Sequence, residues 1–247
     1  MFWNRWKISW KLFFAILNLV FQFFAEIQYT EIMIKLVAFL GNYGKEYEKT
    51  RHNVAWQFED SLPFATKLSW QNKFKGNFSV VEPENLSSWC AEFGILSKKD
   101  GSPVLVPAEM EKIFFLKPET YMNLSGESII EICNFYKIKP EETLVVHDEL
   151  ELPLGTVSLK WSGGLGGHNG LRSTKQVFGT ADFWRLRFGL TKPTNRDIAD
   201  YVLGKFTEDE QIILSQIFPQ ATELFAKVLF SKDPSKFLQE WGKKKLI

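Results

Sequence analysis

The sequence predicts an α/β fold built around a parallel sheet. Three short apolar runs, Leu36–Leu40, Lys112–Lys117 and Thr143–Val146, have the length and content of buried strands. Helical patterns and polar loops lie between these runs, and strands that alternate with helices form parallel sheets. The 247 residues suffice for one large domain or two small ones, and 45% hydrophobic with 24% charged content is typical of globular proteins.

The first expected strand, Leu36–Leu40, leads into a tight turn at residues 41–44, where glycine adopts positive φ and asparagine tolerates it. Thr50 is expected to cap the next helix, which contains His52 and ends at Pro63. The turn, with Asn42 in it, would then lie at the end of a strand, where open α/β sheets bind ligands.

His52 is the candidate general base. At a helix N-terminus the dipole favours the neutral imidazole, which is the form that accepts a proton. The alternative is a surface or capping histidine without a chemical role, and His168 is the next candidate for the base. All three histidines stand beside an asparagine or an aspartate, which favours a function; the pairs are His52-Asn53, His147-Asp148 and His168-Asn169.

The rest of the chain continues the α/β pattern. A strand is expected within Gln71–Glu82, and residues 84–110 are expected to form a surface insertion with little regular structure, because Asn, Gly, Ser and Pro interrupt them. Ser125 is expected to cap a helix over residues 128–136. After the third apolar run we expect a hairpin strand, a glycine-rich loop, a helix, another strand and two helices, at residues 153–160, 162–170, 170–178, 183–190, 197–203 and 208–230.

Residues 1–32 differ in composition from the rest of the chain, since ten of them are aromatic. Their apolar stretch, Leu12–Ala25, is interrupted by Asn18 and Gln22 and is shorter than the ~20 residues that a spanning helix needs. A signal peptide would need a small-residue cleavage site, which is missing, and a membrane-surface anchor is a further alternative. We expect an N-terminal apolar extension outside the fold, a domain of residues 33–247 and no membrane partner.

Cysteine and charge content limit the function classes. Cys90 and Cys133 form no CxxC motif and are expected to be free thiols of a cytoplasmic protein. The net charge is +1, and from Met33 onward basic and acidic side chains balance. A polyanionic partner would therefore have to be bound by a local patch of charge.

Three asparagines and an aspartate follow the expected strands or glycine turns, namely Asn42, Asn123, Asn169 and Asp148. The asparagine amide carries a donor and an acceptor, which suits the binding of an amide or a carbonyl. The Asp148 carboxylate, just past a strand end, is placed to hold a histidine in one tautomer and to stabilise its charged form. Each residue alone is better explained as a turn former or a cap, but four of them at one end of a parallel sheet indicate a site.

The glycine-rich loop SGGLGGHNG, residues 162–170, exposes backbone N–H groups that suit a phosphate. It matches neither G-x-G-x-x-G nor the P-loop, so it does not indicate a nucleotide cofactor. Lys160 and Arg187, on the flanking strands, are candidates for phosphate binding, with solvated strand faces as the alternative. No metal-ligand spacing and no G-x-S-x-G motif occurs, so we expect neither a metal nor a cofactor.

Four segments resemble the bacterial peptidyl-tRNA hydrolases in order and spacing: LVAFLGNYGKEYEKTRHN, FLKPETYMNLSG, VVHDELELPLG and KWSGGLGGHNGLRS. The resemblance extends from about Met33 to near the C-terminus. It implies a single α/β domain with a twisted, mixed, largely parallel sheet flanked by helices, and no metal. It also implies a monomeric, cytoplasmic esterase that releases the peptide from the 3′ ribose of tRNA and so recycles peptidyl-tRNA from stalled translation.

The resemblance also implies roles for single residues. His52 would be the catalytic base and Asp148 its partner, and Asn42 would contact the peptide beside the scissile ester. The substrate channel would be lined by Tyr47, Tyr121, Met122, Asn123 and Asn169. Lys160 and Arg187 would bind the 5′ phosphate of the tRNA. Since the helix dipole lowers and Asp148 raises the pKa of His52, we expect only that the working form is the neutral imidazole near neutral pH.

The sequence departs from the family pattern at four places. Tyr43 stands where the family usually has proline, which would loosen the turn that holds Asn42. Residues 84–110 are inserted relative to shorter members, the part from Met33 onward is neutral, and residues 1–32 have no counterpart. Because no catalytic residue is missing, we expect an active enzyme. The alternative is a non-catalytic tRNA- or RNA-binding module, which would need the phosphate clamp but no intact pair of histidine and aspartate.

Overall fold

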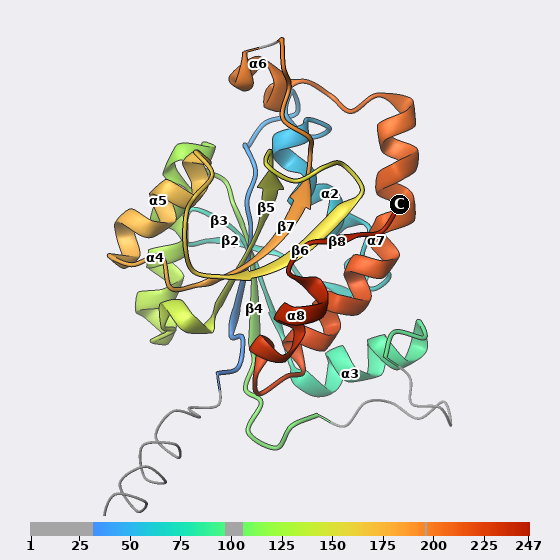
Figure 1. The fold of residues 1–247 in the computed structure, drawn as a ribbon. Coiled ribbons are helices and arrows are strands. Elements are labelled where there is room, and N and C mark those ends of the chain that lie inside the picture. The colour runs from blue at the N-terminus through green and yellow to red at the C-terminus, as the bar shows by residue number, and fades with distance from the viewer. Residues whose placement is uncertain (1–31, 97–105, 196) are drawn as a thin grey trace, which may run out of the picture. The chain divides into compact units, whose positions relative to one another are not determined.

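An eight-stranded mixed sheet lies at the centre of the residues that the structure describes, 32–96, 106–195 and 197–247 (Figure 1). The structure is a computed structural model. The strand order is β2-β3-β4-β1-β5-β7-β6-β8. The strands are β1 Leu36–Phe39, β2 Gln71–Lys73, β3 Gly76–Val81, β4 Ile113–Pro118, β5 Thr143–Glu149, β6 Thr156–Trp161, β7 Trp184–Gly189 and β8 Lys244–Lys245.

The centre of the sheet is parallel and its two sides are antiparallel. Strand β1 pairs in parallel with β4 and β5, and β5 pairs in parallel with β7. Antiparallel pairs join β2 to β3, β3 to β4, β6 to β7 and β6 to β8. The predicted α/β fold with a mixed sheet is therefore confirmed. The four parallel strands end at one edge of the sheet, and open α/β folds bind their ligands at this edge.

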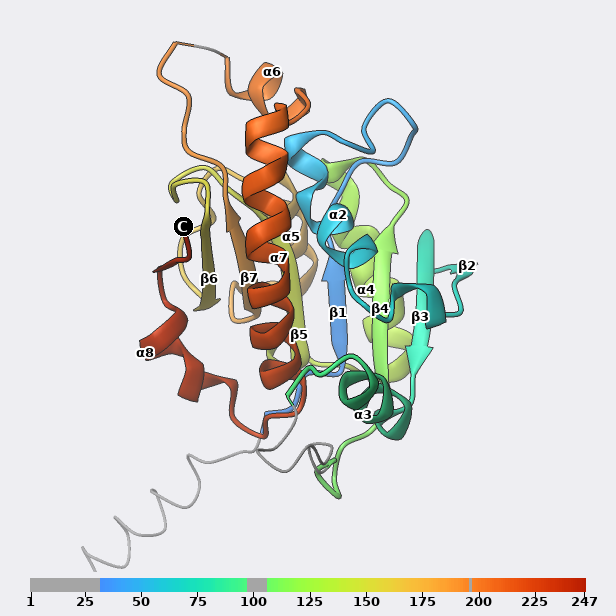
Figure 2. The same ribbon diagram turned by 90° about the vertical axis from the view of Figure 1, so that its right-hand side faces the viewer.

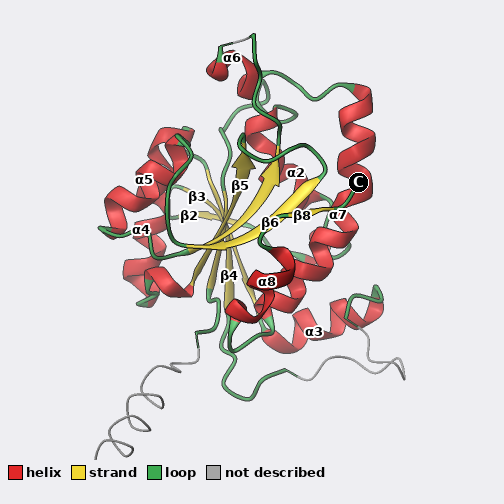
Figure 3. Cartoon of the chain, in the orientation of Figure 1, coloured by secondary structure: helices red, strands yellow, loops and turns green. Residues whose placement is uncertain are grey.

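Helices cover both faces of the sheet (Figures 2 and 3). Helices α4 Ser125–Tyr136 and α5 Asn169–Phe178 lie on one face, and α2 Val54–Asp60 and α7 Glu208–Leu229 lie on the other. The remaining helices are α3 Pro83–Glu92, α6 Ile198–Leu203 and α8 Leu238–Trp241. Turns of 3₁₀ helix occur at Arg51–Asn53, Ala65–Lys67, Met122–Leu124, Pro140–Glu142 and Pro234–Phe237.

The continuous apolar runs of the sequence reflect the burial of the central strands by helices on both faces of the sheet. In β1, Val37 and Phe39 belong to the core cluster that includes side chains of α2 and α7, whereas Leu36 and Ala38 belong to the cluster that includes α4 and α5. A strand that is buried on both faces has no polar position to alternate with. This is why the central strands could be predicted from apolar content alone.

Residues 84–110 are more ordered than the sequence suggested. The expectation of little regular structure is wrong for α3, Pro83–Glu92, in which Leu86 and Cys90 are buried against the core. Pro83 occupies the start of this helix, where proline is favoured, and residues four apart share one helix face. Residues 97–105 lie outside the described part of the chain, and the insertion relative to other family members remains a prediction.

The helices expected after Thr50 and Ser125 form, but neither hydroxyl caps a helix N–H group. Thr50 occupies the N-cap position of the 3₁₀ turn that precedes α2, as predicted, but its hydroxyl donates to Tyr47 O at 2.8 Å. Ser125 is the first residue of α4, and its hydroxyl donates backwards to Met122 O at 2.9 Å. Strand β5 is also longer than expected, so Asp148 lies within the strand and not just past its end.

Cys90 and Cys133 are free, as predicted. Both are also buried, and burial raises the pKa of each thiol to about 12. Within the described residues, no helix has both the length and the apolar content to cross a membrane. The proposed N-terminal extension, residues 1–32, lies outside the described part except for its last residue, so it stays a prediction.

Candidate active site

The turn after β1 is joined to the turn after β4 through Asn42. Asn42 N donates to Asn53 Oδ1 and Asn53 Nδ2 donates back to Asn42 O, both at 2.9 Å. Met122 N donates to Asn42 Oδ1 at 2.8 Å. Because Met122 N can only donate, the atom facing it is the amide oxygen. Asn42 Nδ2 has no partner among the described residues and is the donor that remains for a ligand.

Helix α2, which follows the turn in the chain, also packs against it through Trp56. A Cβ on Gly41 would lie 2.6 Å from Trp56 Nε1, and this nitrogen donates to Phe39 O at 2.9 Å. Tyr43, in contrast, points outward with 56% of its surface exposed. The turn is therefore fixed by the two bonds between Asn42 and Asn53 and by the close approach of Trp56, with tyrosine at position 43.

His52 lies in the 3₁₀ turn before α2 and contacts the end of β5. Its Nδ1 is 2.8 Å from Asp148 Oδ1. A carboxylate only accepts, so Nδ1 carries the hydrogen and the basic lone pair is on Nε2. Burial opposes a charge on His52, but the Asp148 charge and hydrogen bond outweigh burial, and the pKa of His52 is raised. Burial likewise opposes the charge of Asp148, but the two neighbouring histidines hold the pKa of Asp148 well below its ordinary value.

A second histidine donates to the same carboxylate oxygen. His168 Nε2 is 2.9 Å from Asp148 Oδ1. His168 is also the N-cap of α5, where its Nδ1 accepts from Gly170 N at 3.1 Å and from Leu171 N at 3.3 Å. Both ring nitrogens are thus engaged, one as an acceptor and one as a donor. His168 orients Asp148 and has no lone pair left for a proton, whereas Nε2 of His52 has no partner among the described residues.

These groups line an open cavity of about 760 Å³ at the edge where the parallel strands end. In Figure 2 this is the upper edge, beside α6 and the loop after β1. Eight of the ten residues predicted from the sequence line this cavity: Asn42, Tyr47, His52, Tyr121, Met122, Asn123, Asp148 and Asn169. Met122 is buried, whereas Tyr121 is 61% exposed and open to an approaching ligand.

The comparison with known proteins agrees with this geometry. Residues 36–246 match the family model described as peptidyl-tRNA hydrolase. A peptidyl-tRNA hydrolase of Treponema pallidum is 40% identical over 218 residues, which are 87% of this chain and 97% of that protein. The chain belongs to the peptidyl-tRNA hydrolase family. A second family member, from Desulfitobacterium hafniense, is 40% identical over 78% of this chain and 94% of that protein.

The fold agrees with that of solved family members. The crystal structure of peptidyl-tRNA hydrolase from Acinetobacter baumannii matches this structure with a TM-score of 0.63 at 31% sequence identity. The match covers 79% of this chain and 88% of that chain. The resemblance noted in the four sequence segments is therefore confirmed at the level of family and fold.

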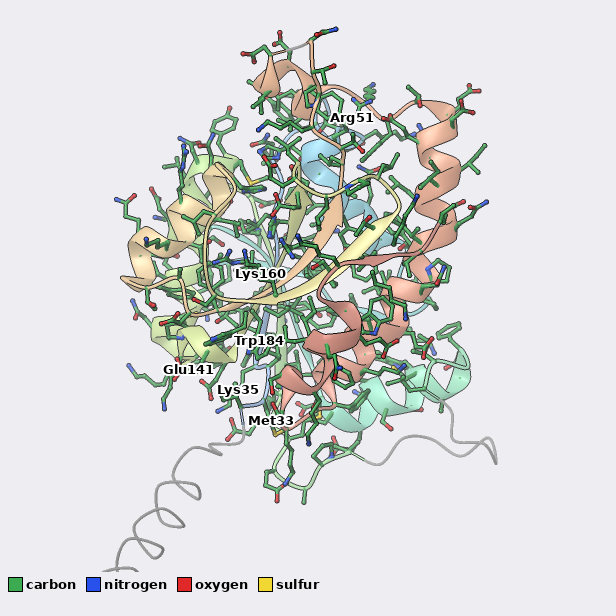
Figure 4. All side chains as sticks on the ribbon, viewed as in Figure 1. Met33, Lys35, Arg51, Glu141, Lys160 and Trp184 are labelled. Carbon is green, nitrogen blue, oxygen red and sulfur yellow. The ribbon has the colours of Figure 1, made fainter. Side chains whose placement is uncertain are left out.

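The remaining two predicted residues, Lys160 and Arg187, line a second cavity of about 620 Å³. Lys160 lies on β6 (Figure 4) and Arg187 on β7. Glu149 and Gly166 line both cavities, so the two are neighbours. The alternative of a solvated strand face is wrong for Arg187, which is 7% exposed and donates to Ser158 Oγ at 2.6 Å.

Folding also assembles a donor set that could bind a metal ion. His52, Asp148 and His168 place ligand atoms within 4.8 Å of one another, which the separations along the chain do not reveal. In the structure both histidines donate their ring hydrogens to Asp148, so a metal ion would have to replace two protons. The arrangement of hydrogen bonds is that of a histidine–aspartate pair with a supporting histidine.

Two contributions to the site were missed from the sequence. Asn53 was noted only as the neighbour of His52, although it holds Asn42. Helix α6 was predicted, but not that Ile198, Val202 and Leu203 line the same cavity as His52 and Asp148. The place of α6 depends on tertiary packing, which no local pattern encodes.

Proposed function

We propose that this protein hydrolyses the ester bond between a peptide and the 3′ ribose of tRNA, with His52 as the general base. The observation that carries the proposal is the division of roles around Asp148 Oδ1. His52 donates from Nδ1 and keeps Nε2 without a partner among the described residues, while His168 uses both its nitrogens. Membership of the peptidyl-tRNA hydrolase family supports the substrate class.

The proposed reaction needs only a positioned water and this base. His52 Nε2 takes a proton from the water as the water oxygen attacks the ester carbonyl carbon, and the Asp148 charge stabilises the imidazolium. Asparagine amides in the cavity stabilise the developing oxyanion. The bond between the carbonyl carbon and the ribose oxygen then breaks, and the imidazolium returns its proton to that oxygen. The products are the peptide carboxylic acid and tRNA with a free 3′ hydroxyl.

The other lining residues would position the substrate. Asn42, through Nδ2, contacts the peptide beside the scissile ester and helps to reject aminoacyl-tRNA with a free amino group. The walls of the channel are formed by Tyr47, Tyr121, Met122, Asn123 and Asn169. Ile198 and Leu203 of α6, which are 46% and 42% exposed, supply apolar surface for the peptide.

Lys160 and Arg187 would bind the 5′ phosphate of the tRNA in the second cavity. The protein has a formal net charge of only +1, so these two local charges would supply much of the attraction to RNA. Binding of the tRNA should therefore weaken as the salt concentration rises. We further propose that the protein acts as a cytoplasmic monomer and needs no metal ion. A non-catalytic RNA-binding module is not favoured, because such a module needs no histidine that is held by an aspartate and left with a basic nitrogen.

The test is release of the peptide moiety from N-acetyl-aminoacyl-tRNA by the purified protein. We expect many turnovers per enzyme molecule, without added metal, and no release from the same tRNA with a free amino group. Stable binding of the blocked substrate without any release would identify a binding module and would contradict the proposal.

A further inference from the structure

The C-terminal segment brings another cation to the second cavity. Strand β8 pairs antiparallel with β6, with Lys244 opposite Val157. This pairing places Lys243, the residue before β8, in the lining of the cavity beside Lys160 and Arg187. Lys244 is engaged elsewhere, since its Nζ is 2.6 Å from Glu240 Oε1.

The two carboxylates in the same lining are already paired. Arg187 Nη1 lies 3.3 Å from Glu149 Oε2, with both side chains buried. Lys192 Nζ lies 3.0 Å from Glu151 Oε1 at the surface. The charge of Arg187 is therefore balanced within the protein, and the negative charges of the cavity are balanced as well.

Lys160 and Lys243 are the cations that remain. Neither forms an ion pair with any residue that the structure describes. Burial lowers the pKa of Lys160, the charges of Arg187, Arg185 and Lys243 lower it further, and the charge of Glu149 opposes them without reversing the direction. An anion that binds between two cations offsets the repulsion between them. A phosphate monoester carries a charge of about −1.5 to −2 near neutral pH, which matches two lysines.

Arg187 has a further role in this arrangement. Its Nη2 donates to Ser158 Oγ at 2.6 Å and to Gly242 O at 3.3 Å, and Ser158 Oγ also donates to Gly242 O. Gly242 directly precedes Lys243. The buried guanidinium thus ties the C-terminal segment to β6 and fixes the backbone from which Lys243 extends.

We propose that Lys243 and Lys160 together form the seat of the 5′ phosphate of tRNA, and that Arg187 positions Lys243. The proposal rests on the proposed function, because peptidyl-tRNA supplies the phosphate monoester. It assigns to the C-terminal lysine a part in substrate binding, and it assigns to the buried arginine a structural part in addition to its charge.

The test compares N-acetyl-aminoacyl-tRNA that carries its 5′ phosphate with the same tRNA after phosphatase treatment. Dissociation constants and KM are measured for the unaltered protein, Lys243→Gln, Lys160→Gln and Lys245→Gln. Lys245 is the matched control, because it is exposed on the same segment but does not line the cavity. We expect Lys243→Gln and Lys160→Gln each to weaken binding of the phosphorylated tRNA about five- to tenfold, with kcat unchanged. Neither change should affect the dephosphorylated tRNA.

Three other results would distinguish failure of the Lys243 assignment, of the phosphate site and of the proposed function. If Lys243→Gln binds the phosphorylated tRNA as Lys245→Gln does while Lys160→Gln is weakened, Lys243 has no part in the seat and the proposal is overturned. If removal of the phosphate leaves binding by the unaltered protein unchanged, the cavity is no phosphate seat, although hydrolysis would still support the proposed function. If the tRNA binds in a phosphate-dependent way but no peptide is released, the proposed function fails and the seat stands.

Discussion

At the scale of residues, two histidines share a single carboxylate oxygen, and their other ring nitrogens distinguish them as candidate bases. Asp148 Oδ1 accepts from His52 Nδ1 at 2.8 Å and from His168 Nε2 at 2.9 Å. The two imidazoles differ in the hydrogen bonds of their second ring nitrogen. His168 Nδ1 accepts the capping hydrogen bonds of α5, whereas His52 Nε2 has no partner among the described residues. Two chemically identical side chains thus acquire different roles from their hydrogen-bond partners.

Asp148→Asn tests this coupling through the pH dependence of activity. The Asp148 charge raises the pKa of His52 against the opposing effect of burial. Without the charge, burial dominates and the pKa of His52 falls. Activity declines where His52 takes up a proton, so the acid limb of kcat/KM should move to lower pH. The plateau should drop by roughly 10²-fold or more, because the imidazolium loses its stabilising charge. An acid limb at unchanged pH would show that Asp148 does not act on the base.

At the scale of elements, strands were easier to predict than helix ends. Strands β1, β4 and β5 are buried on both faces, so their continuous apolar runs are enough to predict that they are strands. Thr50 is the N-cap residue of the 3₁₀ turn before α2, whereas Ser125 is already the first residue of α4, and both hydroxyls donate to backbone carbonyls instead of capping helix N–H groups. Such a choice depends on local geometry that the residue types allow but do not determine.

Helices α4 and α5 approach each other at a glycine, and this contact can be tested by Gly126→Ala. A Cβ on Gly126 would lie 2.3 Å from Ser173 O, and Gly126 N donates to Ser173 Oγ at 2.9 Å. Because Ser173 O belongs to the backbone of α5 and cannot rotate away, an added methyl group on α4 would force the two helices apart. We expect the free energy of unfolding in urea to fall by about 1–3 kcal/mol. Asn134→Ala, at an exposed position of α4, is the control and should leave stability unchanged or slightly raised. Equal stability of both variants would contradict the close contact.

At the scale of the whole molecule, the sequence predicted the family and eight residues that line the first cavity, because these residues lie in four continuous segments. His52, Asp148 and the three asparagines lie in motifs that can be recognised locally. What could not be predicted comes from distant segments, namely the wall of α6 and Lys243 beside Lys160. These positions follow from helix docking and from the pairing of β8 with β6, which are properties of the folded chain.

Removal of residues 1–32 is the corresponding test of domain organisation. The aromatic composition changes at Met33, and the family match begins at residue 36. A chain that starts at Met33 should therefore fold and hydrolyse N-acetyl-aminoacyl-tRNA with the kcat/KM of the full chain. Circular dichroism and activity assays on the two purified proteins would check this. A loss of solubility or of activity in the shorter chain would mean that the first residues belong to the working enzyme.

The central claim, that His52 is the base, is tested most directly by single-turnover hydrolysis with His52→Ala beside a measurement of tRNA binding. The base acts in the transition state and not in docking, so the rate should fall by at least about 10²-fold while the dissociation constant of the blocked substrate stays unchanged. His168→Asn, which loses the cap of α5 and one bond to Asp148, should lose less and keep the acid limb of the pH profile. A His52→Ala protein that keeps most of its hydrolysis rate would contradict the claim.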